Sequence, residues 1–137
     1  MDDRKNIVTA AIIRKDKKIL IAQRNNDSFL EANKWEFPGG KVEQNETYEE
    51  CLIREIHEEL GIQISIDCLF LVTKHVYSKE HRTIPITLVV YLTDWVAGEV
   101  QSIDCQDAQW VDLHDLRSYD FAEADIPIVK KLVDLIH

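Results

Sequence analysis

The sequence has little of what marks a disordered, disulfide-linked or membrane-spanning chain. Four Gly, three Pro and 45% hydrophobic residues among 137 residues disfavour intrinsic disorder. Three cysteines, an odd number without a CxxC pair, favour packing residues in a reducing compartment over a disulfide or a zinc site. No stretch approaches the length of a membrane span, and the first six residues lack the apolar core of a targeting segment. We therefore expect one cytoplasmic domain, residues 1–137, without a membrane partner.

Basic residues are also scarce. The 16 Lys and Arg residues are outnumbered by 25 Asp and Glu residues, which gives a formal net charge of −9. Such a chain repels polyanions, so a nucleic-acid polymer or an anionic membrane is a poor partner. An acidic protein can still bind phosphates when divalent cations lie between the two negative groups. The charge is thus compatible with metal-bridged phosphate binding.

Hydrophobic patterning predicts an α+β domain. Strands are expected at 7–13 and 19–22, which form a hairpin, and at 35–37, 62–73, 83–93 and 108–111. Pro38-Gly39-Gly40 should stop the short third strand. A final helix has Pro127 in its first turn, and its apolar face consists of Ile128, Val129, Leu132, Val133 and Ile136. The order of strands, helix, strands and helix predicts a mixed sheet covered by helices on both faces.

A helix over residues 47–60 has the clearest signals. Thr47 and Glu50 form a capping box at its start, and Gly61 is placed to end it. Its apolar stripe consists of Leu52, Ile53, Ile56 and Leu60. This stripe should dock the helix onto the sheet.

The opposite face of that helix carries Glu55, Glu58 and Glu59 at i, i+3 and i+4, so three carboxylates should point into one small volume. Clustered carboxylate oxygens are the ligands that Mg²⁺ or Mn²⁺ needs. The alternative is an ordinary solvated acidic face. It is disfavoured because Glu58 and Glu59 lie at the end of the helix where the macrodipole opposes anions. Upstream, Gly39 and Gly40 would let backbone approach an ion or a phosphate closely.

These residues together resemble the Nudix box. Gly40, five residues, Glu46, seven residues and then the segment 54–62 fill every fixed position of that pattern. The flanking segment 32–41 resembles the MutT branch of the Nudix superfamily. The resemblance implies a Nudix-type α/β/α sandwich with a mixed sheet between helices. It also implies Mg²⁺- or Mn²⁺-dependent hydrolysis of a nucleoside triphosphate to monophosphate and pyrophosphate.

The resemblance also assigns roles by position. The implied metal ligands are the side chains of Glu55, Glu58 and Glu59 and the carbonyl of Gly39. Arg54 and Glu46 are implied to form a salt bridge that orients the ligand carboxylates. These residues make up the implied catalytic machinery.

One more acidic ligand is implied by the MutT branch, on a loop six residues before a Trp. With Trp110 as that Trp, Asp104 stands at the matching position. Asp is one methylene shorter than the usual Glu, so Asp107 is an alternative ligand. Glu58, Glu59 and Asp104 are alternatives for the carboxylate that takes the proton from the attacking water.

Three further residues are expected to contact substrate. Lys41 can neutralise phosphate oxygens. Arg24 matches a substrate-contacting arginine of the family, with a surface charge at the end of a strand as the alternative. Asp125 stands where MutT enzymes hold a base-reading Asn and resembles the CTP pyrophosphohydrolase branch, whereas its alternative role is the N-cap of the last helix. Candidates for base stacking are Trp35, Phe37, Tyr77 and Phe121, although core packing is the commoner role.

The implied substrate is 8-oxo-dGTP, CTP or a related nucleotide, as in enzymes that sanitise the nucleotide pool. Two alternatives stay open. One is Nudix hydrolysis of a nucleoside diphosphate derivative such as ADP-ribose. The other is a sensor domain that binds a nucleotide without cleaving it. The expected partner is a small nucleotide, and the chain is expected to be a monomer or a homodimer.

Overall fold

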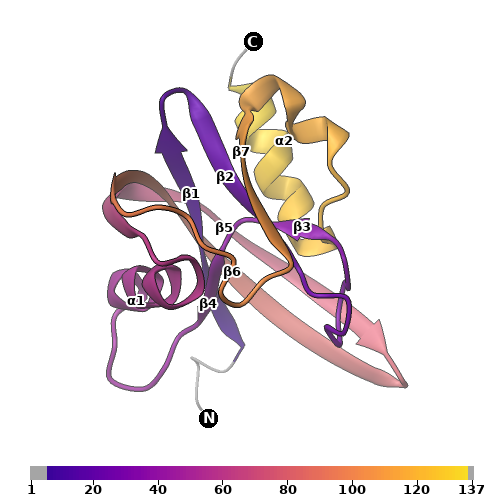
Figure 1. The fold of residues 1–137 in the computed structure, drawn as a ribbon. Coiled ribbons are helices and arrows are strands. Elements are labelled where there is room, and N and C mark those ends of the chain that lie inside the picture. The colour runs from indigo at the N-terminus through magenta and orange to yellow at the C-terminus, as the bar shows by residue number, and fades with distance from the viewer. Residues whose placement is uncertain (1–5, 136–137) are drawn as a thin grey trace.

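Two helices lie against opposite faces of a seven-stranded mixed sheet in the computed structural model, which describes residues 6–135 (Figure 1). The strands are β1 (Ile7–Lys15), β2 (Lys18–Gln23), β3 (Trp35–Glu36), β4 (Gly39–Lys41), β5 (Gln63–Lys79), β6 (Arg82–Ala97) and β7 (Asp107–Asp112). The helices are α1 (Tyr48–Leu60) and α2 (Ile126–Asp134), with short 3-10 segments at Leu113–Ser118 and Glu123–Asp125. This arrangement confirms the predicted α+β fold. Residues 1–5 and Ile136, which entered the predictions above, lie outside the described residues.

Strand β1 is central because both of its edges are paired. One edge binds β6 in parallel, and the other binds β4 with its first half and β2 with its last residues, both antiparallel. The path through the sheet is β3-β2-β1-β6-β5, with β4 attached to β1 and β7 attached to β2. This topology brings the glycine pair of β4 beside the central strand.

Alternate residues of β1 face the two helices. Ala10 and Ile12 belong to the core under α2, whereas Ala11 and Ile13 belong to the core under α1. All four are almost fully buried. A strand covered on both faces has no exposed side to fill with polar residues, which explains why residues 7–13 of β1 are apolar except for the buried Thr9.

Helix α1 has the predicted capping box and ends at Gly61, whose φ of 71° places it in the left-handed region. Leu52, Ile56 and Leu60 are fully buried against the sheet. Ile53, which was predicted to share this stripe, is 43% exposed, so that part of the prediction was wrong. It lies one residue off the four-residue spacing and is therefore rotated away from the sheet.

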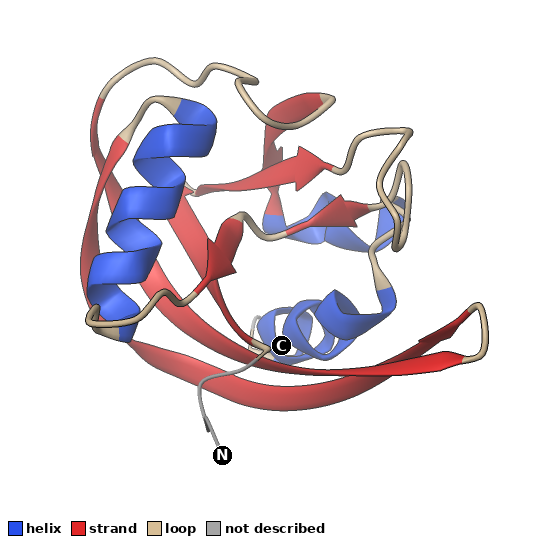
Figure 2. Ribbon diagram, turned by 90° about the horizontal axis from the view of Figure 1, so that it is seen from below, coloured by secondary structure: helices blue, strands red, loops and turns tan. Residues whose placement is uncertain are grey.

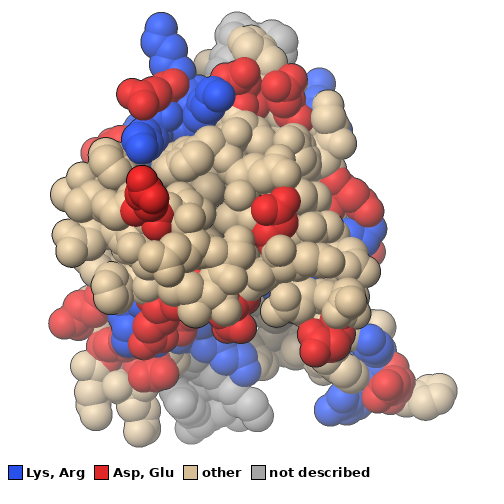
Figure 3. Space-filling view, in the orientation of Figure 1, with Lys and Arg blue, Asp and Glu red and all other residues tan. Residues whose placement is uncertain are grey.

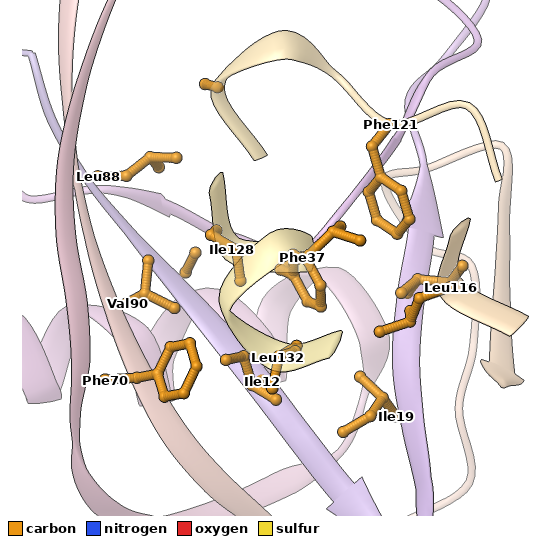
Figure 4. Close-up of a cluster of buried hydrophobic side chains, with 14 of the residues drawn as sticks. Ile12, Ile19, Phe37, Phe70, Leu88, Val90, Leu116, Phe121, Ile128 and Leu132 are labelled. Atoms are coloured by element: carbon orange, nitrogen blue, oxygen red, sulfur yellow. The ribbon is translucent and has the colours of Figure 1, made fainter. Parts of the chain in front are cut away.

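Helix α2 covers the other face of the sheet. Its buried side chains are Ile128, Val129, Leu132 and Val133, which confirms the described part of the predicted apolar face. Figure 4 shows Ile128 and Leu132 in a cluster with residues from β1, β2, β5 and β6 and with Leu116 and Phe121, which precede α2. Neither helix in residues 6–135 has the length and apolarity required to cross a membrane.

Both long hairpins close over two residues without glycine. Asp16 and Lys17 join β1 to β2, and Glu80 and His81 join β5 to β6, all with φ between 52° and 68°. Two consecutive left-handed residues twist in the same sense as the strands they connect, which makes such turns compatible with long ladders. β5 and β6 extend well beyond the predicted limits, and their tip projects past the rest of the sheet (Figure 2).

The cysteines occupy different environments. Cys51 is buried, Cys105 is half-buried and Cys68 is exposed, and all three are free thiols. The expectation that all of them are packing residues was therefore wrong for Cys68. It lies in β5, next to a register shift between Ile66 and Cys68 where the strand is irregular.

Candidate active site

A pocket of about 580 Å³ is lined by residues from almost every layer of the fold. Two chemically different groups line it. One group, from β4, the end of α1 and the loop before β7, comprises Gly39, Gly40, Lys41, Glu59 and Asp104. The other, largely apolar group comprises Leu30, Phe37, Tyr77, Ile84, Ile86, Leu88, Ala122 and Ala124, together with Arg24, Glu36 and Asp125. The pocket thus combines a charged region with an apolar one, as a nucleotide requires.

Strand β4 needs its glycines because its neighbours are too close for a side chain. A Cβ at Gly39 would lie 1.9 Å from the carbonyl oxygen of Thr9, and one at Gly40 would lie 2.2 Å from the carboxyl carbon of Glu55. The third strand ends before Pro38, as predicted, but Gly39 and Gly40 begin a further short strand that was not predicted. The close approach places the Glu55 carboxyl directly against the β4 backbone.

Arg54 joins three carboxylates on one side of α1. It donates to both carboxylate oxygens of Glu46, over 3.0 Å from Nε and 2.8 Å from Nη2. Its Nη1 donates to Glu55 over 2.9 Å and to Glu58 over 3.2 Å. The hydrogen bonds from Arg54 lower the pKa of Glu46 to about 2, so Glu46 stays ionised. The structure therefore contains the Arg54–Glu46 salt bridge that the resemblance implied.

The three glutamates do not converge as the sequence analysis predicted. Glu59 lies within hydrogen-bond distance of Glu55, whereas Glu58 has a 59% exposed side chain that pairs with Arg54. Within residues 6–135, no three His, Cys, Asp or Glu side chains are grouped around one ion position. The guanidinium of Arg54 lies between two of these carboxylates, since its Nη1 donates to both Glu55 and Glu58.

Glu59 lies half-buried at the pocket wall, next to other acidic residues. Burial raises the pKa of its carboxyl to about 9, and neighbouring negative charges add to the effect. These charges belong to Glu36, Glu55 and Asp104. A half-buried carboxyl amid other carboxylates gains strongly from a nearby cation. The donor set consists of hard oxygens beside a glycine backbone, so it fits a divalent ion such as Mg²⁺.

The structure separates the two candidates for the additional acidic ligand. Asp104 lines the pocket, and its charge acts on Glu59. Asp107 is not among the lining residues. Its carboxylate accepts hydrogen bonds from the Ala108 N–H over 2.8 Å and from the Gln109 side-chain amide over 2.9 Å. Asp107 is thus engaged in the start of β7.

Arg24 and Glu36 form a pair in the pocket wall. Arg24 Nη1 donates to Glu36 over 2.8 Å, and its Nε donates to the Leu30 carbonyl over 3.0 Å. Burial lowers the pKa of Arg24, but the neighbouring Glu36 carboxylate outweighs this effect, so the pKa of Arg24 is raised. Arg24 is therefore a half-buried pocket residue, and its alternative as a surface charge at the end of a strand was wrong. Glu36 was missed, although an acidic residue between Trp35 and Phe37 was a visible signal.

Asp125 is a buried acid that faces the pocket. Its Oδ2 accepts a hydrogen bond of 2.8 Å from the Phe37 N–H, and its side chain makes no cap bond to α2. The prediction that the side chain caps the last helix was therefore wrong. The backbone of Asp125 lies in the helical region, where its side chain is not directed at the first N–H groups of the helix. Burial raises the pKa of Asp125 well above its usual value.

The four stacking candidates have separate roles. Phe37 stacks on Phe121 with ring centroids 5.4 Å apart, and Trp35 meets the edge of Tyr119 at 5.2 Å. Of the four, only Phe37 and Tyr77 line the pocket. The Tyr77 hydroxyl accepts a hydrogen bond from the Ala124 N–H, which ties β5 to the segment that carries Asp125.

Charged side chains are unevenly distributed on the face of the molecule shown in Figure 3. Uncharged side chains form a broad central area that contains two acidic patches, and Lys and Arg lie at its edges beside acidic residues. The cations on this face are therefore mixed with acids and do not form a continuous basic patch.

Comparison with known proteins places the chain among nucleotide hydrolases. The family model described as NUDIX domain matches residues 3–132. The CTP pyrophosphohydrolase of Escherichia coli is 35% identical over 132 residues, which cover 93% of this chain and 91% of that protein. The 8-oxo-dGTP diphosphatase of the same organism is 36% identical over 126 residues, with coverage of 91% and 94%. An ADP-ribose pyrophosphatase of Methanocaldococcus jannaschii is 34% identical over 113 residues, which are 80% of this chain and 63% of that protein.

A solved structure shares the architecture. A structure of MutT, from work on the Aliivibrio salmonicida and Vibrio cholerae proteins, aligns with a TM-score of 0.74 and 30% identity. The alignment covers 95% of this chain and 97% of the other. The fold is therefore shared over nearly the whole chain.

Proposed function

The chain belongs to the NUDIX domain family, and from this we propose that it hydrolyses a nucleoside triphosphate to the monophosphate and pyrophosphate, using Mg²⁺. The proposed substrates are 8-oxo-dGTP, CTP or related nucleotides, which the names of the two Escherichia coli relatives suggest. Such a role belongs in the cytoplasm, where these nucleotides are made and used.

One observation carries the proposal. Glu59 and Asp104 line the same pocket as Asp125 and an apolar wall. Oxygen ligands for a cation and a surface for a nucleobase thus belong to one cavity, formed by residues of a single chain. A sugar and a phosphate chain would connect the two regions.

The residues that would hold the ion are Glu55, Glu58, Glu59 and Asp104, with the carbonyl of Gly39. When bound, a divalent ion offsets phosphate charge and makes a water molecule more acidic. Arg54 would orient two of the carboxylates, since it already holds Glu55 and Glu58 by direct hydrogen bonds. Lys41 lines the pocket beside the glycine pair and would bind phosphate oxygens. Glu58, Glu59 and Asp104 remain the proposed alternatives for the group that accepts the water proton.

Asp125 would select the base. Because burial favours its neutral form, the carboxyl can donate one hydrogen bond and accept another. Cytosine offers a ring nitrogen acceptor beside its N4 amino donors. An 8-oxo-guanine offers O6 as acceptor and N7–H as donor, whereas ordinary guanine has acceptors at both positions. Arg24 lines the same pocket and would contact the nucleotide.

A nucleotide panel with product identification tests the proposal. We would compare kcat/KM for 8-oxo-dGTP, dGTP, CTP, 5-methyl-dCTP and ADP-ribose with Mg²⁺. Pyrophosphate as the product from a triphosphate, with preference for 8-oxo-dGTP or a cytidine nucleotide over dGTP, is the expected result. Release of orthophosphate would contradict it, as would a preference for ADP-ribose. Tight binding without turnover would identify a sensor domain instead.

A further inference from the structure

The segment from Gln101 to Gln106 joins two distant parts of the pocket wall. The Gln101 N–H donates to the Leu60 carbonyl over 2.9 Å, and the Ile103 N–H donates to the Glu59 carbonyl over 3.0 Å. The last carbonyls of a helix have no partner within the helix, so this segment supplies them. The first half of the segment is therefore fixed to the end of α1. One of its two anchors there is Glu59, which lines the pocket. Figure 1 shows the segment, in orange, running from α1 towards the start of β7.

Its other end is fixed by Gln106. The Gln106 N–H donates to the Gln23 carbonyl over 2.9 Å. Its side-chain amide donates to the Asn33 Oδ1 over 2.9 Å and to the Arg24 carbonyl over 3.3 Å. The Gln23 amide in turn donates to the Asn33 carbonyl over 3.0 Å. One glutamine side chain therefore links the segment to the end of β2 and to the loop before β3.

Asp104 lies between these two anchors. It is an exposed residue in a stretch without regular structure, so no helix or strand sets its position. An Asp side chain also has less length than a Glu with which to correct a displaced backbone. The place of its carboxyl in the pocket depends on how firmly the segment is fixed on each side.

We propose that Gln106 is a positioning residue that holds Asp104 at the cation-binding side of the pocket. This inference rests on the proposed function, in which Asp104 is one of the carboxylates that bind the divalent ion. Gln106 itself does not line the pocket, and it acts on the site through the backbone of the segment.

Manganese binding without nucleotide gives the first test, since it does not depend on turnover. In Gln106→Ala, the affinity for Mn²⁺ measured by electron paramagnetic resonance should fall about tenfold, as is usual when a partner that orients a ligand is lost. The kcat/KM at low Mg²⁺ should fall by a similar factor, and part of the loss should be recovered at high Mg²⁺. Gln109→Ala is the matched control. Gln109 is also exposed, and its side chain bonds Asp107 and Tyr119 outside the pocket.

A double-mutant cycle with Asp104→Asn tests the route of action. If Gln106 acts through Asp104, removing its side chain costs little once the Asp104 carboxylate is gone, so the two losses are not additive. Asn33→Asp keeps an acceptor for the Gln106 amide and should retain most of the Mn²⁺ affinity. Additive losses would overturn the proposal, as would a Gln106→Ala variant that changes KM alone and binds Mn²⁺ normally. A wild-type protein that neither binds Mn²⁺ nor cleaves nucleotides would instead refute the proposed function.

Discussion

The carboxylate of Asp125 accepts a hydrogen bond from the backbone N–H of Phe37, with 2.8 Å between Oδ2 and N. The two residues are 88 positions apart, and Asp125 is only 6% exposed. The bond ties the start of α2 to the connection between β3 and β4. It also satisfies a backbone donor that would otherwise be buried without a partner.

The Asp125→Asn variant should become more stable relative to wild type as the pH rises. The unfolded state releases the Asp125 proton near pH 3.9, whereas the folded state has a raised pKa and releases it later. Wild type therefore loses stability as the pH rises above about 4, until the folded carboxyl also ionises. Asn keeps the acceptor for Phe37 and has no proton to release. Thermal melts at pH 4 and pH 7.5 measure this change.

The comparison has a built-in control in Asp125→Ala. That variant leaves the Phe37 N–H without its partner, so it should be less stable than Asp125→Asn by about 1–3 kcal/mol at both pH values, since neither variant has a proton to release at this position. An Asp125→Asn variant that becomes less stable relative to wild type as the pH rises would show that the buried carboxyl is stabilised in its ionised form.

Cys51 should contribute to stability through its thiol. Its Sγ lies 3.3 Å from the Lys41 carbonyl oxygen and 3.4 Å from the Thr9 hydroxyl, which itself donates to the Gly40 carbonyl over 3.2 Å. Burial raises the pKa of Cys51 to about 11, so the thiol keeps its proton and can donate. We expect Cys51→Ala to lower the free energy of unfolding by about 1–2 kcal/mol, measured by urea titration. The exposed Cys68→Ala is the control, and equal effects of the two substitutions would contradict this role.

The parts of the fold that follow from local patterns were predictable. The capping box and Gly61 fixed the ends of α1 because these signals lie within one helical turn of the ends. Strand β4 was missed because its pairing with β1 joins residues that are 31 positions apart, such as Thr9 and Gly40. From the sequence alone, two adjacent glycines indicate a turn. Here they reflect close packing against a strand and a helix, which depends on tertiary structure.

In the site, too, some contacts were predictable from the sequence and others depend on tertiary structure. The resemblance to the Nudix box implied the contact between Arg54 and Glu46, although Glu46 precedes the helix that carries Arg54. It did not predict that Arg54 would also hold Glu55 and Glu58 through one nitrogen, Nη1. Asp125 was expected to read the base or to cap the helix, and its hydrogen bond with a backbone N–H was not predicted. Its partner Phe37 comes from a distant segment that only the folded chain brings near.

Lys17→Gly should stabilise the hairpin between β1 and β2. Lys17 has a φ of 68°, where a Cβ is unfavourable and glycine is not. We expect a gain of about 1 kcal/mol in the free energy of unfolding, because the strain removed exceeds the entropy that glycine adds to the unfolded chain. Lys18→Gly, one residue later in β2, should instead destabilise the protein. A loss of stability in Lys17→Gly as large as that in Lys18→Gly would contradict the turn geometry.

The Glu58→Gln variant tests whether Glu58 is a metal ligand or only a surface charge. The Glu58 side chain is 59% exposed and pairs only with Arg54 among the ion pairs of residues 6–135, so Gln should change stability by less than about 0.5 kcal/mol. If Glu58 binds the divalent ion, the same change should reduce kcat by about 100-fold or more and weaken Mn²⁺ binding. Glu49→Gln, an exposed glutamate in the first turn of the same helix, should leave both measurements unchanged. Normal turnover in Glu58→Gln would mean that the pairing with Arg54 is the whole role of this residue. The ion would then have to be bound by Glu55, Glu59 and Asp104 without it.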